Sequence, residues 1–132
     1  MNNAGQDASD RIRVLIVDDD LSYLESLHDL IDRQPELAVV GEATDGLEAI
    51  ELAEHLDPDA VVIDLHMPLL DGVTAAARLR RDHPNVCLIA LTGDKAPALR
   101  RAARDAGADE VLLKTELVDG LVERLANVRT RS

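Results

Sequence analysis

The sequence predicts an α/β domain in which a five-stranded parallel sheet is covered by helices on both faces. Short apolar runs rich in Val and Ile alternate with longer segments whose Leu and Ile recur at helical spacing. The connections between these segments are short, and such strand–helix pairs wind right-handed into a parallel sheet. A length of 132 residues suits one domain of this kind. With five strands, we expect the doubly wound order 2-1-3-4-5.

The expected elements follow one another with no repeat, linker or second domain. Residues 1–10 are polar and unpatterned and predict a disordered lead, 11–128 form the domain, and 129–132 form a short tail. The expected strands are 12–17, 37–41, 60–64, 86–91 and 111–113. The expected helices are 21–34, 47–56, 73–81, 98–106 and 117–125. Gly107 stands where a left-handed residue would end the fourth helix.

The composition and charge of the chain argue against nucleic-acid and membrane partners. The chain has 26 acidic and 14 Lys and Arg side chains, a formal net charge of −12 at pH 7. Nucleic-acid surfaces need clustered Lys and Arg, so we expect no direct nucleic-acid binding. No apolar segment is long enough to span a membrane, and 1–7 lack the apolar run of a signal peptide, so we expect a cytoplasmic protein. Cys87, within the apolar run 86–91, predicts a reduced thiol in the core.

Asp64 is the first candidate functional residue. It follows an apolar, largely β-branched run that fits a strand buried on both faces, and a loop containing Pro68 and Gly72 comes next. Asp64 therefore stands at the carboxyl end of a strand, where open α/β sheets bind ligands. Taken alone, an Asp in this position is more often a cap or a turn former.

Polar residues also follow or end other strands. Asp18 and Asp19 follow the first strand, Thr92 follows the fourth and Lys114 the fifth. Because the first and third strands are expected neighbours, the acidic pair and Asp64 meet at one edge and repel one another. A bound Mg²⁺ relieves this repulsion, since it takes oxygen ligands and keeps several waters. A hydroxyl and an ammonium, expected on the other side of Asp64, complete the groups that stabilise a transferring phosphoryl group.

In combination, these residues resemble a response-regulator receiver domain, the phosphoacceptor half of two-component signalling, with a flavodoxin-like fold. The resemblance covers 11–128 and is carried by Asp18-Asp19 after 14–17, Asp64 with Met67-Pro68 and Asp71-Gly72, Leu91-Thr92 and Lys114. It implies that Asp64 accepts a phosphoryl group from a histidine kinase or a phosphotransfer protein. The chain would then be a phosphorylated signalling domain that catalyses its own phosphoryl transfer and dephosphorylation, rather than an enzyme with a separate substrate.

The resemblance also implies which residues hold the cofactor Mg²⁺. Asp19, Asp64 and the backbone carbonyl of His66 would ligate the ion directly. Asp18 would act through a water molecule.

Other roles follow from the same resemblance. Thr92 and Lys114 would bind the phosphoryl oxygens, and Thr92 would relay the change to a surface formed by the fourth helix, the fifth strand and the fifth helix. His66 and Asp94 would flank the path of the attacking water and tune the lifetime of the phosphoryl group, by screening or by orienting that water. The alternative is that both are solvated loop residues.

Two positions depart from the family pattern. The residue three before Lys114 is usually aromatic, whereas here it is Val111, and the common Pro after the lysine is Thr115. Val is stiff at its single χ angle. The only aromatic residue, Tyr23, lies in the first helix, so we expect that it cannot replace the aromatic side chain missing at position 111. We therefore expect switching to displace 93–97 with little rotamer change at Val111.

The sequence leaves the output open. Stretches 40–43, 45–46 and 106–109 resemble most the receivers whose full-length members carry a helix-turn-helix output domain. We expect a stand-alone receiver that acts on a protein partner; the alternative is the receiver half of a helix-turn-helix transcription regulator. Arg100, Arg101 and Arg104 form a positive patch. A solvated helix face is the simpler explanation, and the alternative is a surface that suits an acidic partner or a weak homodimer.

Two other classes share parts of the pattern. A dehalogenase-type phosphatase also uses an Asp nucleophile, and Asp18-x-Asp20, Thr92 and Lys114 mimic three of its motifs. It is disfavoured because no acidic pair follows Lys114 on a further buried strand and no cap insertion is present. An FMN-binding module is disfavoured because 18–20 are all Asp where a phosphate needs donors.

Overall fold

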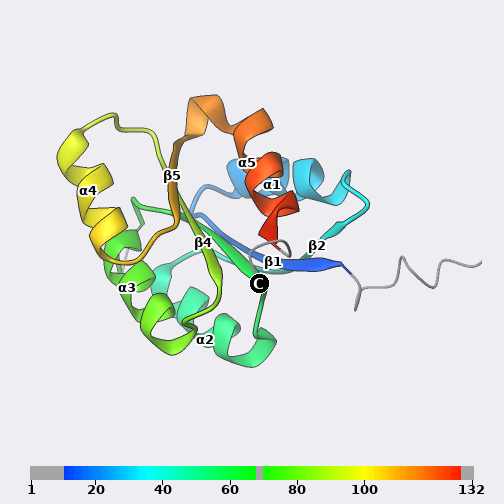
Figure 1. The fold of residues 1–132 in the computed structure, drawn as a ribbon, viewed down its shortest axis with the longest axis horizontal. Coiled ribbons are helices and arrows are strands. Elements are labelled where there is room, and N and C mark those ends of the chain that lie inside the picture. Colours follow the sequence, from blue (N-terminus) through cyan, green and yellow to red (C-terminus); the bar gives the residue numbers. More distant parts are fainter. Residues whose placement is uncertain (1–10, 68–69, 129–132) are drawn as a thin grey trace, which may run out of the picture.

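The computed structural model describes residues 11–67 and 70–128, apart from the side chains of 116–119. Five parallel strands form one sheet in the order β2-β1-β3-β4-β5 (Figure 1), which confirms the expected topology. The strands are β1 (Ile12–Val17), β2 (Leu37–Ala43), β3 (Ala60–Asp64), β4 (Cys87–Thr92) and β5 (Glu110–Leu113). The helices are α1 (Leu21–Asp32), α2 (Gly46–Leu56), α3 (Gly72–Asp82), α4 (Pro97–Asp105) and α5 (Leu117–Ala126), with a 3₁₀ turn, η3 (Lys114–Glu116), before α5.

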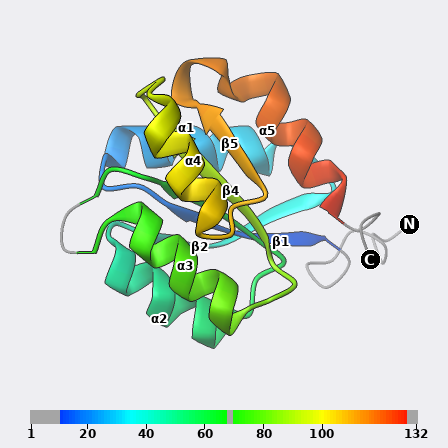
Figure 2. The ribbon, with the colours of Figure 1, turned by 60° about the vertical axis from the view of Figure 1, so that its left-hand side comes forward.

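Helices cover both faces of the sheet. Helices α1 and α5 lie on one face, and α2 and α3 lie on the other, with α4 beside α3 against β4 and β5 (Figures 1 and 2). Alternate residues of each central strand enter opposite cores: Val14 and Ile16 pack with α1 and α5, whereas Leu15 and Val17 pack with α2 and α3. The central strands β1 and β3 are therefore buried on both sides, as their apolar runs predict.

The element bounds match the expected ones to within two residues, and β2 shows how one of the two-residue differences arises. The expected strand ends at Gly41, but the ladder with β1 continues to Ala43. The register jumps between Val14 and Leu15, which leaves Val40 as the extra residue of a bulge. Gly41 is therefore a paired strand residue and not the end of the strand. The expected lead 1–10 and tail 129–132 lie outside the described residues.

An Asp precedes each of the first three helices and caps it. Asp20 accepts from the backbone N–H groups of Ser22 and Tyr23, while Asp45 and Asp71 cap α2 and α3 in the same way. Such caps satisfy backbone donors that the first helical turn leaves free. They fix where each helix leaves the carboxyl edge of the sheet.

Two glycines occupy positions where a side chain would clash or where the backbone has a positive φ. A Cβ on Gly72 would lie 2.3 Å from the carbonyl oxygen of Asp64, so only glycine lets α3 begin directly against the end of β3. Gly107 has φ +114° and follows α4, which confirms the expected left-handed end of that helix.

None of the helices in the described part of the chain has the length and apolar character needed to cross a bilayer.

Candidate functional site

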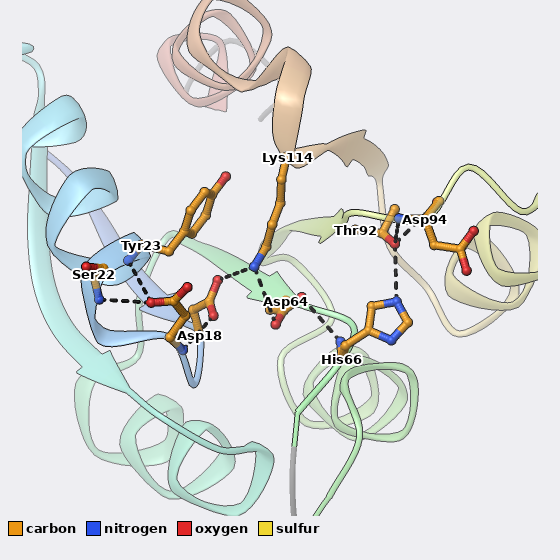
Figure 3. Close-up of polar contacts among 9 residues, drawn as sticks. Asp18, Ser22, Tyr23, Asp64, His66, Thr92, Asp94 and Lys114 are labelled. Carbon is orange, nitrogen blue, oxygen red and sulfur yellow. Dashed lines mark hydrogen bonds and ion pairs between the residues drawn. The ribbon is translucent and has the colours of Figure 1, made fainter.

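The buried polar side chains mark the site. Among the described residues, three polar or charged ones are buried: Asp18 at 0% exposure, Asp64 at 3% and Thr92 at 0%. Each lies at the end of a different strand, β1, β3 or β4, on the carboxyl edge of the sheet (Figure 3). Burying polar groups is costly unless they are paired, so their concentration at one edge indicates a site.

Asp18 is held by both carboxylate oxygens. Its Oδ1 accepts a hydrogen bond from the backbone N–H of Asp20 at 2.9 Å, and its Oδ2 lies 2.7 Å from the Lys114 ammonium. Asp19, the next residue, is exposed. Carboxylate oxygens of Asp18, Asp19 and Asp64 lie within 4.8 Å of one another, which confirms that the acidic pair and Asp64 converge.

Asp64 occupies the centre of this group. Its Oδ1 accepts from the backbone N–H of His66 at 3.2 Å, and its Oδ2 lies 3.6 Å from the Lys114 ammonium. Burial, and then the charge of Asp18, raise the pKa of Asp64 above its usual value, although the His66 N–H and Lys114 oppose the change. Lys114 therefore compensates the negative charge of Asp64 only in part.

Lys114 reaches further than expected. It follows β5, beyond β4, and was expected to lie across Asp64 from the acidic pair; instead its side chain extends over Asp64 to pair with Asp18 (Figure 3). The four-carbon stem of lysine makes this reach possible. Burial on its own lowers the pKa of Lys114, but its hydrogen bond to Asp18 and the charge of Asp64 outweigh that effect and raise the pKa.

The donor set fits a divalent cation. Three carboxylates and one ammonium, Asp18, Asp19, Asp64 and Lys114, leave two uncompensated negative charges in one cluster. All the acidic ligand atoms are oxygens, which Mg²⁺ prefers. Burial raises the pKa of Asp64 most, and the charge of Asp18 adds to the rise, so positive charge placed here would favour the ionised cluster.

Thr92 is tied to the loop that precedes α4. Its hydroxyl accepts from the backbone N–H of Asp94 at 2.9 Å, donates to the Asp94 carbonyl at 3.3 Å and lies 3.4 Å from Nε2 of His66. The Asp94 carboxylate in turn accepts from the backbone N–H of Ala96 at 2.8 Å. The expected rate-tuning residues His66 and Asp94 thus both contact Thr92, one by its imidazole and the other by its backbone.

Val111 lies beneath α4 and not in the site. It is 2% exposed and packs in a small core with Leu65, Ala90 and Ala103. Its carbonyl oxygen accepts a hydrogen bond from Arg100 at 3.3 Å. Arg100 is therefore partly buried against β5, which leaves Arg101 and Arg104 as the exposed members of the expected basic patch.

Sequence reasoning gave Tyr23 no role here, yet its ring lies over the Lys114 ammonium, 4.3 Å from the ring centroid (Figure 3). Tyr23 is the third residue of α1, four residues after Asp19. A helix that starts immediately after the acidic pair places its first turn beside those carboxylates, and this spacing was the available signal.

The fold and the site together define the class. The chain belongs to the response regulator receiver domains, whose family model matches residues 14–126. This match decides against the dehalogenase-type phosphatase and the FMN-binding module.

Relatives with different outputs share this domain. A protein-glutamate methylesterase/protein-glutamine glutaminase from Thermotoga maritima is 40% identical over 100 residues, which cover 74% of this chain and 29% of that protein. The response regulator domain of Thermotoga maritima CheB matches with a TM-score of 0.84 and 32% identity, over 91% of this chain and 97% of that one. A LuxR-family response regulator from Aurantimonas sp. SI85-9A1 matches with a TM-score of 0.80 and 33% identity, over 89% and 86%. The chain spans about a third or less of the curated relatives' length.

Proposed function

We propose that this receiver accepts a phosphoryl group on Asp64 and thereby switches a protein-interaction surface. The observation that carries the proposal is the position of Asp64: it is buried at the end of β3, between the acidic pair and Thr92, with Lys114 above it. The donor is a histidine kinase or a phosphotransfer protein of a cytoplasmic two-component system.

In the transfer step, a carboxylate oxygen of Asp64 forms a bond to phosphorus while the phosphorus–nitrogen bond of the donor histidine breaks. The electron pair of that bond stays on the leaving imidazole. Lys114 offers an ammonium 3.6 Å from Asp64, close enough to balance charge on the transferred group. The Thr92 hydroxyl reaches that group by exchanging its bonds to Asp94.

Asp19, Asp64 and the His66 carbonyl would hold Mg²⁺ directly, and Asp18 would hold it through a water molecule. When bound, the ion supplies the positive charge that phosphoryl transfer requires. The Lys114–Asp18 pair already occupies one oxygen of Asp18, which supports the indirect role of that residue.

The surface of α4, β5 and α5 is the proposed output. Thr92 is bonded to the loop that leads into α4, so a movement of its hydroxyl displaces the start of that helix. Arg101 and Arg104 are exposed on α4 and suit an acidic partner or a weak homodimer. A LuxR-type output domain, the methylesterase type of the sequence relatives and a separate protein are all compatible partners for this surface.

The test is phosphorylation by a small acyl phosphate with Mg²⁺, followed by mass spectrometry. We expect one added phosphoryl group, lost in Asp64→Asn and in excess chelator. Asp71→Asn is the matched control, because Asp71 is a nearby Asp that caps α3. Labelling that survives in Asp64→Asn but is lost in Asp18→Asn would show that Asp18 is the nucleophile.

The output surface is tested separately. Reversing charge in Arg101→Glu/Arg104→Glu should weaken partner binding or self-association of the phosphorylated chain, with labelling of Asp64 unchanged. Unchanged binding and association would show that α4 presents a solvated face at these positions.

A further inference from the structure

The ring of Tyr23 approaches the site from α1. The N-cap residue Asp20 accepts hydrogen bonds from the backbone N–H groups of Ser22 and Tyr23, which anchors the first turn of α1 to the loop that carries the acidic pair. The half-buried side chain of Tyr23 packs on the core shared by α1 and α5. Backbone and side chain together set the ring in place before any ligand binds.

The Lys114 ammonium has three neighbours in this arrangement. It lies 2.7 Å from Asp18 Oδ2, 3.6 Å from Asp64 Oδ2 and 4.3 Å from the Tyr23 ring centroid. Tyr23 and Asp18 lie on the α1 side of the ammonium, and Asp64 lies on the other side (Figure 3). A cation over an aromatic face is attracted by the ring quadrupole, and the attraction grows where water is excluded.

The phenol group of Tyr23 does not explain the position of this residue. Its oxygen is buried and has no hydrogen-bond partner among the described residues, which is an unfavourable environment for a hydroxyl. Burial, and then the charges of Asp18 and Asp64, raise the pKa of Tyr23, so the phenol stays neutral. The ring, and not the hydroxyl, makes the contact with the site.

We propose that Tyr23 is a positioning residue for phosphoryl transfer: its ring holds the Lys114 ammonium between Asp18 and Asp64. Lysine has a long stem whose rotamer freedom is lost when the ammonium is fixed, and a ring beside the ammonium reduces the number of competing rotamers. The inference rests on the proposed function of Asp64. It assigns a part in the reaction rate to a side chain on α1, outside the residues that carry the resemblance to the family.

Two matched substitutions separate the ring from the hydroxyl and from simple packing. Tyr23→Phe keeps the aromatic face and removes the phenol oxygen, while Tyr23→Leu keeps an apolar side chain without an aromatic face. With acyl phosphate and Mg²⁺, we expect Tyr23→Leu to phosphorylate about fivefold more slowly, within the range of a cation–π contact, and Tyr23→Phe to match the wild type. Circular dichroism and thermal unfolding establish that each variant is folded.

A spectroscopic measurement reports the position of Lys114 directly. The chain has two lysines, Lys95 and Lys114, so lysine-selective isotope labelling gives two side-chain signals. The ring current should move the Hε resonance of Lys114 upfield of exposed Lys95 in the wild type and in Tyr23→Phe. In Tyr23→Leu the two resonances should converge.

The rates of the Tyr23 variants and the lysine spectra together decide whether Tyr23 positions Lys114. A folded Tyr23→Leu variant with the wild-type rate overturns it, and so does a Tyr23→Phe variant that is as slow as Tyr23→Leu, because the hydroxyl would then be responsible. If the wild type itself takes no phosphoryl group, the function proposed for Asp64 fails. The lysine spectra then judge the positioning alone, and an upfield Lys114 resonance that persists in Tyr23→Leu overturns it.

Discussion

The Lys114 ammonium lies closer to Asp18, at 2.7 Å, than to Asp64, at 3.6 Å. The lysine therefore pairs first with the fully buried carboxylate that is not the proposed phosphoacceptor. One oxygen of Asp64 remains less tightly engaged, and the exposed Asp19 stands on the open side of the cluster. Because Lys114 occupies Asp18 and leaves Asp19 free of that contact, we expect the two aspartates to differ in how they bind a metal ion.

Asp19→Ala should lose most of the affinity for Mg²⁺, by about tenfold or more, because Asp19 is the proposed direct ligand. Asp18→Ala should weaken binding less, because the ammonium already occupies one oxygen of Asp18. Calorimetric titration of each variant with Mg²⁺ measures both effects. A larger loss in Asp18→Ala than in Asp19→Ala would reverse the two assignments.

Asp64→Asn should stabilise the metal-free protein at pH 7.5, because the substitution removes a buried negative charge beside Asp18. Burial and Asp18 raise the pKa of Asp64, so the folded state prefers the protonated carboxyl. Its ionised form therefore costs stability in full above the folded pKa, and this cost shrinks as the pH falls through the folded pKa and is gone below the unfolded pKa. Urea unfolding at pH 7.5 and pH 4 tests both parts.

The matched control for that experiment is Asp29→Asn, since Asp29 is exposed on α1. Saturating Mg²⁺ should reverse the advantage of Asp64→Asn, because ligand binding stabilises the wild-type folded state. An advantage of the same size at both pH values would show that charge is not its origin.

Replacing His66 and Asp94 by Ala should shorten the lifetime of the phosphoryl group by about threefold. The His66 imidazole reaches from the end of β3 to Thr92, so we expect it to screen attacking water, while Asp94 caps the loop beside it. Loss of the label after donor removal gives the rate. An unchanged rate would establish that both are solvated loop residues.

Phosphorylation should shift residues 93–97 more than the Val111 methyl groups. Thr92 is bonded to that loop, whereas Val111 is packed in an apolar core beneath α4 and is stiff at χ1. Amide and methyl NMR spectra with and without a phosphoryl mimic make the comparison. Large changes at Val111, with none in 93–97, would place the relay in β5 instead.

His28→Gln should lower stability more at pH 5.5 than at pH 8.5. The hydrogen bond with Glu42, and also the charge of Asp32, raise the pKa of His28. The stabilisation is therefore complete below the unfolded pKa and is lost as the pH rises through the folded pKa. Because these side chains are more than a third exposed, the effect should not exceed about 0.5 kcal/mol.

His55→Gln provides the control for His28, because His55 contacts the backbone carbonyl of Glu51 on its own helix. Urea unfolding of both variants at the two pH values isolates the contribution of the carboxylates. An equal loss at both pH values in His28→Gln would attribute the contact to packing.

Strand order and the convergence of Asp18, Asp19 and Asp64 could be predicted because both follow from which runs are apolar and where they end. The bulge at Val40 could not, because it depends on how β2 aligns with β1. The pairing of Lys114 with Asp18 depends on which rotamer a long side chain adopts, and sequence order does not determine that choice. Tyr23 was missed for a related reason: its role depends on the angle at which α1 leaves the sheet.

Tyr23 also gives this protein an unusual optical property. The chain contains no Trp and one Tyr, so its intrinsic fluorescence arises from a single ring beside Lys114. No second fluorophore dilutes or quenches that emission. Any event that moves the ammonium or changes the charge around it should therefore alter the whole tyrosine emission of the unlabelled protein. The occupancy of the acidic edge can then be followed in real time without a dye, a tag or an added tryptophan.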